Sequence, residues 1–179
     1  RTNSTAFSGI LRNGAMTRNY SMPRFIVLLA LLASSLPLPL FAASCSFITP
    51  DGSTLVNFST VMSLQTTPAD GQGQIIFTCT QDGLDTRPVS YEMSIDTGNS
   101  STFTPRLLMH SSGATLDYNL YSDRQRRKIL GDGSAGTETV SGRCRIVCTP
   151  LIVYGRIPTN QWGPAGQYSD TVIVTLEFN

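Results

Sequence analysis

The final segment of the chain, YSDTVIVTLEFN, has the pattern that most constrains the fold. From Tyr168 to Phe178 the even-numbered positions are mostly apolar and the odd-numbered ones mostly polar, and this period of two predicts a strand with one buried face. A core strand without a partner would expose a row of unpaired N–H and C=O groups and would promote aggregation. The partner of this last strand is therefore the main question that the sequence raises.

The composition is that of one globular domain. The chain has 179 residues, of which 40% are hydrophobic and 14% are charged, against a usual charged share of about 25%. Four of the thirteen basic residues precede residue 43, which leaves nine against twelve acidic residues in the remainder, a net charge of −3. This acidic balance gives no electrostatic reason to bind nucleic acid.

Residues 22–42 have the organisation of a secretory signal peptide. Met22 and Arg24 precede an apolar run, and Ala42 offers a small-residue exit for cleavage before Ala43. Prolines interrupt the run well before the roughly 20 apolar residues that a membrane-spanning helix needs. A lipoprotein signal with acylation of Cys45 is the alternative. We expect export through the periplasm to the cell surface.

Three segments follow from this interpretation. Residues 1–21 show no structural pattern and are expected to lie upstream of the natural start, so we exclude them from the predicted fold. Residues 22–42 form the signal peptide, and residues 43–179 form one domain.

The four cysteines are expected to form two disulfides. Cys45, Cys79, Cys144 and Cys148 are an even number in an oxidising compartment. Of the three possible connectivities we favour Cys45 with Cys79 and Cys144 with Cys148. The first of these bonds would stabilise the fold by roughly 3 to 4 kcal/mol on the chain-entropy model. A zinc site is the weaker alternative, because only Cys144 and Cys148 are closely spaced.

The domain is predicted to be all-β. Short β-rich runs alternate with turn clusters such as GDGSAG, and no segment has a sustained helical period. Such spacing favours an antiparallel, immunoglobulin-like β-sandwich. The predicted strands are residues 53–61, 73–81, 88–96, 114–123, 150–158 and 170–178.

Few residues offer catalytic chemistry. The only histidine, His110, stands at a strand end and is expected to be solvated, and no pair of carboxylates is placed for catalysis. We therefore predict no enzyme, no metal and no cofactor. Trp162, in PTNQWGP, is interpreted as a core plug, with a surface ligand contact as the alternative. The basic stretch RQRRK is expected to be a solvated loop.

Several motifs in order resemble the spore coat protein U domain family, which includes subunits of archaic, Csu-type chaperone-usher pili. They are CSF, GQIIFTCT, RLLM, LDYNLYSD, LGDGSAGT and VYGRIPTNQWGPAGQYSDTVIVTLEF. The resemblance covers residues 45–178. The pair Cys144 and Cys148 is not part of the family pattern.

This resemblance implies an incomplete sandwich that lacks its final strand. In such pilins a periplasmic chaperone, and then the N-terminal extension of a sister subunit, adds a strand beside the C-terminal one. The outer-membrane usher would be a further partner. The edge that receives the added strand would then consist of Val172, Val174, Leu176 and Phe178.

The expected function is that of a structural subunit of a pilus that serves adhesion or biofilm formation. Cleavage after Ala42 would leave Ala43 and Ser44 ahead of Cys45, too short a segment to supply a donor strand, which points to the tip of the fibre. The alternative is a complete sandwich, either a self-contained coat protein or a carbohydrate-binding module with Trp162 as a stacking platform.

Overall fold

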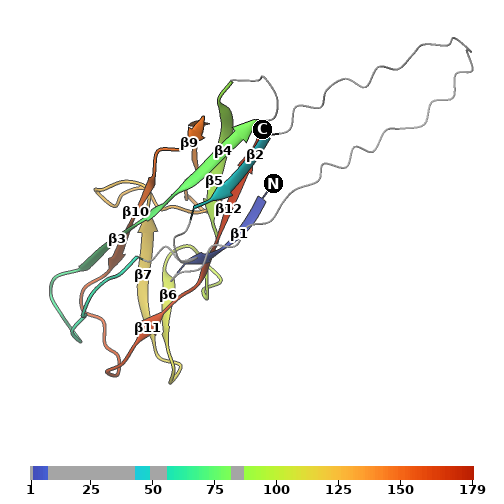
Figure 1. Cartoon of the computed structure of the whole chain (residues 1–179). Coiled ribbons are helices and arrows are strands. Elements are labelled where there is room, and N and C mark those ends of the chain that lie inside the picture. Colours follow the sequence, from blue (N-terminus) through green and yellow to red (C-terminus); the bar gives the residue numbers. More distant parts are fainter. Residues whose placement is uncertain (1, 8–42, 49–55, 82–86) are drawn as a thin grey trace, which may run out of the picture.

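The computed structural model describes residues 2–7, 43–48, 56–81 and 87–179. Every regular element in these residues is a β-strand, and the strands form antiparallel sheets around one apolar core. The predicted all-β, immunoglobulin-like sandwich is confirmed (Figure 1). No helix in the described ranges has the length and apolar character to cross a membrane.

The first sheet contains the C-terminal strand. Its four strands are ordered β1–β12–β5–β8, and all neighbours are antiparallel. The C-terminal strand β12 lies inside this sheet and not at its edge. The strands are β1 (Thr2–Phe7), β12 (Val172–Phe178), β5 (Val89–Ile95) and β8 (Val140–Cys144).

The second sheet packs its inner residues against the same core. Its five strands are ordered β11–β6–β7–β10–β3. The longest ladder joins β10 and β3, where Leu151 lies opposite Ile75 and Ile157 opposite Ala69. The strands are β11 (Tyr168–Ser169), β6 (Arg106–His110), β7 (Thr115–Tyr121), β10 (Leu151–Ile157) and β3 (Ala69–Ile75).

A third, smaller sheet closes one end of the sandwich. Its order is β2–β4–β9, with β2 at Ala43–Phe47, β4 at Phe77–Gln81 and β9 at Ile146–Val147. Strands β3 and β4 follow one another along the chain with one residue between them, so the same segment serves two sheets (Figure 1).

The core is made of aliphatic and aromatic side chains from all three sheets. Ile75 and Phe77 at the junction of β3 and β4 are fully buried, as are Met93 of β5 and Val153 of β10. Phe77 packs edge-on against Tyr91, with 4.8 Å between ring centroids, which joins the third sheet to the first.

Arg106 places a charged group in this core. Its side chain is fully buried, and its guanidinium donates hydrogen bonds to the carbonyl oxygens of Asp96 and Leu130 and to Oδ1 of Asn119. Burial lowers the pKa of the Arg106 guanidinium from its ordinary value. Because several acceptors satisfy its donors, this side chain ties β6 and β7 to the segments that follow β5 and β7.

Three of the predicted strands differ from the structure. Residues 73–81 are not one strand, because β3 ends at Ile75 and β4 begins at Phe77 in another sheet. The described part of 53–61, residues 56–61, contains no strand, although Val56 is buried and Phe58 stacks edge-on with Tyr118. The pattern from Tyr168 to Phe178 is also not one strand, because Tyr168–Ser169 pairs with β6 and Val172–Phe178 pairs with β5. The chain changes sheet between them.

Candidate functional site

Both edges of β12 are paired in the structure. On one edge β12 pairs with β5, so that Val174 lies opposite Ile95 and Phe178 opposite Tyr91. On the other edge it pairs with β1, the segment Thr2–Phe7. This segment belongs to residues 1–21, which the sequence analysis left out of the predicted domain. The omission arose because the sequence of residues 2–7 has no apolar alternation.

The register between β1 and β12 identifies the positions that face the core. Thr2 lies opposite Leu176, Ser4 opposite Val174 and Phe7 opposite Val172, with an irregularity between Thr5 and Phe7. Directly opposite residues of antiparallel strands lie on the same face of the sheet. Any strand in the position of β1 therefore directs alternate residues toward the core.

The four residues predicted for the acceptor edge lie on the inward-facing side of β12. Val172, Val174 and Leu176 are fully buried, while Phe178 near the end of the strand is partly buried and packs against the core. Ile173, between Val172 and Val174, is 41% exposed and therefore lies on the outer face of the strand. These exposures apply with β1 in place.

The backbone groups of β12 alternate between the two edges. The carbonyl oxygen of Ile173 accepts a bond from the amide of Asp96, and Asn179 and Ser90 exchange two backbone bonds, so these odd positions bond toward β5. Because the direction alternates along an antiparallel strand, the amides of Val174, Leu176 and Phe178 face the edge that β1 occupies.

Strand β2 borders the same edge from the other side. In the described chain β1 contacts both β12 and β2, and Figure 1 shows the three strands side by side. Cys45 of β2 is joined to Cys79 of β4, its direct partner in the ladder. This disulfide covalently joins β2, the strand that borders this edge of β12, to β4.

The second disulfide joins Cys144 at the end of β8 to Cys148 after β9. Both pairs are those favoured from the sequence. The Sγ atoms of Cys79, Cys144 and Cys148 lie within 4.8 Å of one another. A zinc site would require thiolates, and these sulfurs are covalently paired, so the arrangement does not fit a metal.

A buried carboxylate fixes the start of β12. Asp170 is 3% exposed and accepts hydrogen bonds from the hydroxyl of Tyr118 at 2.6 Å and from the amides of Asn99 and Thr171. Burial raises the pKa of the Asp170 carboxyl above its ordinary value, and burial likewise raises the pKa of Tyr118. This contact occupies the residues between β11 and β12 and explains why the chain changes sheet there.

The side chain of Asp96 binds the backbone of Ile173, the second residue of β12. Its Oδ1 accepts bonds from the amides of Ile173 and Gly98, and its carbonyl oxygen accepts two bonds from Arg106. The buried Arg106 therefore acts on β12 through Asp96. Arg106 is the first residue of the motif RLLM, but no role was predicted for it. A positively charged residue at an inward-facing strand position was the available clue.

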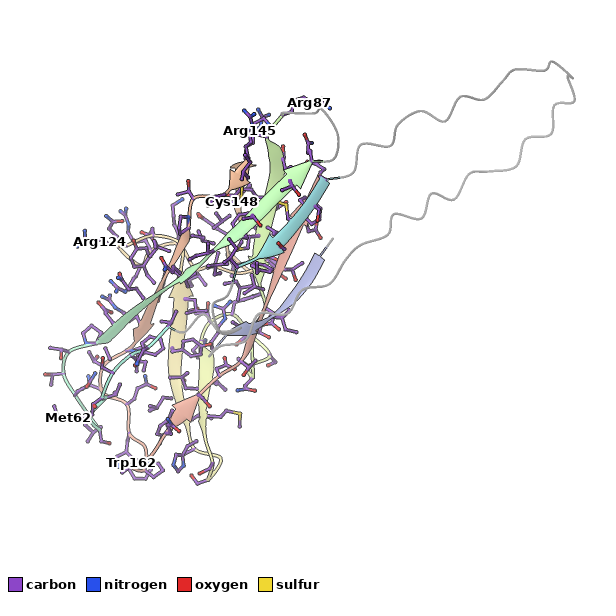
Figure 2. The ribbon with its side chains drawn as sticks, in the orientation of Figure 1. Met62, Arg87, Arg124, Arg145, Cys148 and Trp162 are labelled. Atoms are coloured by element: carbon purple, nitrogen blue, oxygen red, sulfur yellow. A yellow bond between two sulfur atoms is a disulfide. The ribbon has the colours of Figure 1, made fainter. Side chains whose placement is uncertain are left out.

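Trp162 is not the core plug that the sequence suggested. Its side chain is 73% exposed, because the loop that carries it extends beyond the sheets and pairs with another loop. The amide of Leu64 donates to the carbonyl oxygen of Gln161, and the amide of Asn160 donates to that of Gln65. Met62 and Leu64 are also exposed, so three large apolar side chains lie at one end of the molecule, as Figure 2 shows for Met62 and Trp162.

The basic stretch at residues 124–128 is partly structural. Arg126 is mostly buried and pairs with Asp70, which also accepts two bonds from Arg156. The hydrogen bonds from Arg156 lower the pKa of the Asp70 carboxyl. These ion pairs join the loop to β3 and β10.

His110 lies at the end of β6 as expected. Its Nδ1 is 2.7 Å from Oγ of Ser112, and its ring packs against Tyr168. Neither contact is a carboxylate of the kind that orients the imidazole in a catalytic triad.

The comparison with protein families gives one match. The model of the Spore Coat Protein U domain matches residues 30–175. No curated protein matches the chain significantly.

Replacing Asp170 by Asn should change how stability depends on pH. A carboxyl whose pKa is raised on folding binds its proton more tightly in the folded state, so its contribution to the free energy of unfolding falls as pH rises from the ordinary Asp value, about 4, through the raised folded value. Asp170→Asn removes this dependence. We therefore expect the stability of the variant relative to the wild type to increase across that window.

Urea denaturation of both proteins at a series of pH values measures this difference. Glu177→Gln, on the outer face of the following strand β12, serves as the control. A difference between Asp170→Asn and wild type that stays constant with pH would contradict the assignment.

Proposed function

Because the chain belongs to the spore coat protein U domain family, we propose that it is a structural subunit of a chaperone-usher surface fibre. This domain occurs in Csu-type pilus subunits, and the family is one of structural pilus and coat domains, not of enzymes. In this proposal the edge of β12 receives a strand from a partner protein.

The pairing of β1 is the observation that favours this role. The second edge of β12 is covered by a strand from outside the 43–179 domain, beyond the proposed signal peptide. Removal of residues 1–42 would take this strand away and leave the amides of Val174, Leu176 and Phe178 unpaired. An open edge of this kind between two strands is suited to strand addition, in which backbone bonds supply affinity and alternate side chains supply specificity.

The expected occupant is an extended segment with apolar residues at every second position. In the register of β1, Thr2 and Ser4 occupy the positions opposite Leu176 and Val174. A donor with larger aliphatic residues there would bury more apolar surface, at about 0.8 kcal/mol for each additional buried CH₂ group. The proposed donors are a periplasmic chaperone before assembly and a sister subunit within the fibre, with the outer-membrane usher as the site of exchange.

The same proposal places this subunit at the tip. After cleavage behind Ala42, the mature chain would begin with Ala43, and Ala43 already lies in β2 opposite Gln81. No free segment would then precede the first core strand. The subunit would accept a donor strand and would supply none.

The exposure of Trp162 favours a second candidate function, attachment to a surface or ligand through the end of the molecule that carries Met62 and Trp162. Its indole lies near Met62 and Leu64 at the surface, where an apolar ligand or the face of a sugar ring could stack on it. Trp162→Ala should reduce attachment to immobilised glycans or apolar surfaces and leave chaperone capture unchanged. Equal attachment of variant and wild type would remove this candidate.

The acceptor edge is tested with charged substitutions on its two faces. Val174→Asp and Leu176→Asp should each abolish capture of the subunit by its co-expressed periplasmic chaperone, because an unpaired carboxylate would be buried on strand addition. Ile173→Asp is the matched control, since this residue lies on the same strand and points outward. Co-purification measures capture.

Capture of the two inward variants at the level of Ile173→Asp would contradict the proposal.

The same chaperone-bound preparation tests the position in the fibre. Incubated alone it should form no ladder of polymers on unheated gels, and long ladders would show that the subunit supplies a donor strand.

A further inference from the structure

The two disulfides lie against each other at one end of the sandwich. Sγ of Cys148 is 3.9 Å from Sγ of Cys79, although the two atoms belong to different disulfides. All four cysteines are at least 94% buried. Figure 2 places Cys148 at the end of the molecule near Arg87 and Arg145, opposite the loop end with Met62 and Trp162.

The topology explains this proximity. Cys144 ends β8, where it lies opposite Val89 of the first sheet, and Ile146 of β9 then lies opposite Cys79 of the third sheet. The short loop closed by Cys144–Cys148 therefore passes from one sheet to the other. The amide of Cys148 donates to the carbonyl oxygen of Phe77, which holds its sulfur next to Cys79.

A surface cavity reaches both disulfides. Its volume is about 230 Å³, and its lining includes Cys79, Cys144, Arg87 and Arg145. Both arginines are exposed, so the cavity lies at the molecular surface. Guanidinium groups nearby stabilise thiolates, which are the attacking and leaving groups of thiol–disulfide exchange.

The loop between Cys144 and Cys148 is conformationally strained. Ile146 has φ of 69°, in the left-handed region that a β-branched residue adopts only at a cost. Its side chain is 63% exposed and contributes little packing to offset that cost. Opening the Cys144–Cys148 bond would allow this loop to relax.

We propose that Cys144–Cys148 is a redox-active disulfide that exchanges with the neighbouring Cys45–Cys79 disulfide after attack by an external dithiol. The dithiol thiolate attacks Sγ of Cys144, which lines the cavity, and Cys148 leaves as a thiolate. The second thiol of the reagent then releases Cys144 as a thiol, so that the dithiol is oxidised to a disulfide and the cysteine pair is reduced.

The exchange step follows from the position of Cys148. Its thiolate attacks Sγ of Cys79, the bond between Cys79 and Cys148 forms, and the bond between Cys45 and Cys79 breaks. Cys45 leaves as a thiolate and takes up a proton. This step transfers no net electrons, because one disulfide and two free cysteines are present before and after it.

The consequence concerns β2. Once Cys45 is free, no covalent bond joins β2 to β4. Strand β2, which borders the acceptor edge of β12, is then held by non-covalent contacts alone. The state of a cavity-lining disulfide thus controls strand acceptance. Only this consequence rests on the proposed function, since the exchange itself requires no partner protein.

Two cysteine variants separate the exchange from simple reduction. Cys144→Ser leaves the Cys148 thiol beside Cys79, so after equilibration at pH 8 alkylation and peptide mapping should find a Cys79–Cys148 disulfide and alkylated Cys45. In Cys148→Ser the remaining thiol is Cys144, and we expect alkylated Cys144 with an intact Cys45–Cys79 disulfide. Alkylation of Cys45 should be at least about tenfold higher in Cys144→Ser, which corresponds to a difference of about 1.4 kcal/mol in the exchange equilibrium.

The wild-type protein gives an independent measurement if either variant fails to fold. Treatment with one equivalent of dithiothreitol, acid quenching and alkylation should yield a species with free Cys45 and Cys144 and a Cys79–Cys148 bond. Alkylation confined to Cys144 and Cys148, in the wild type and in the matching variants, would overturn the proposal. These assays use no chaperone, so their failure is distinguishable from failure of the proposed function.

Discussion

The backbone hydrogen bonds along the two edges of β12 are the constraint on which the rest of the structure depends. One edge is joined to β5 as far as Asn179, and the other is joined to a segment outside the 43–179 domain. The inward side chains of β12 are buried in the core when both of these edges are paired. A domain that must bury such a strand and lacks one of its own neighbours needs a partner strand.

The surrounding contacts hold this edge in position. Asp170 and Asp96 bind backbone amides at the beginning of β12, and Arg106 satisfies the carbonyl of Asp96 from within the core. At the other side Cys45–Cys79 anchors β2. The polar contacts fix where β12 begins, and the disulfide fixes β2, the strand that borders its edge. These contacts hold both sides of the proposed acceptor edge in place, which would lower the entropic cost of adding a strand.

Much of this arrangement could be predicted from the sequence. The alternation at 172–178 gave the buried face of β12 correctly, because a period of two is sufficient to assign faces of a strand. Both disulfide pairings and the all-β class also followed from composition and spacing. Local patterns could not show that Asp170 separates Tyr168 from Val172 into different sheets, since that depends on Tyr118, which is 52 residues away.

Other features depend on contacts that no local pattern reports. Trp162 was expected in the core, but its loop pairs with residues 64–65 and projects away from the sheets. Residues 53–61 have strand composition, and yet the described part of them only covers the core with Val56 and Phe58. The pairing of Thr2–Phe7 with β12 was not predicted, because strand pairing through the backbone requires no particular side chains.

Amide hydrogen exchange of residues 43–179, expressed without residues 1–42, tests the central claim most directly. We expect the amides of Val174 and Leu176 to exchange far faster than those of Thr175 and Glu177, because the former face the vacated edge and the latter bond to β5. In the chain that retains Thr2–Phe7, all four amides should be protected. Equal protection of the four amides in the shortened protein would show that β12 has no open edge and would contradict the account.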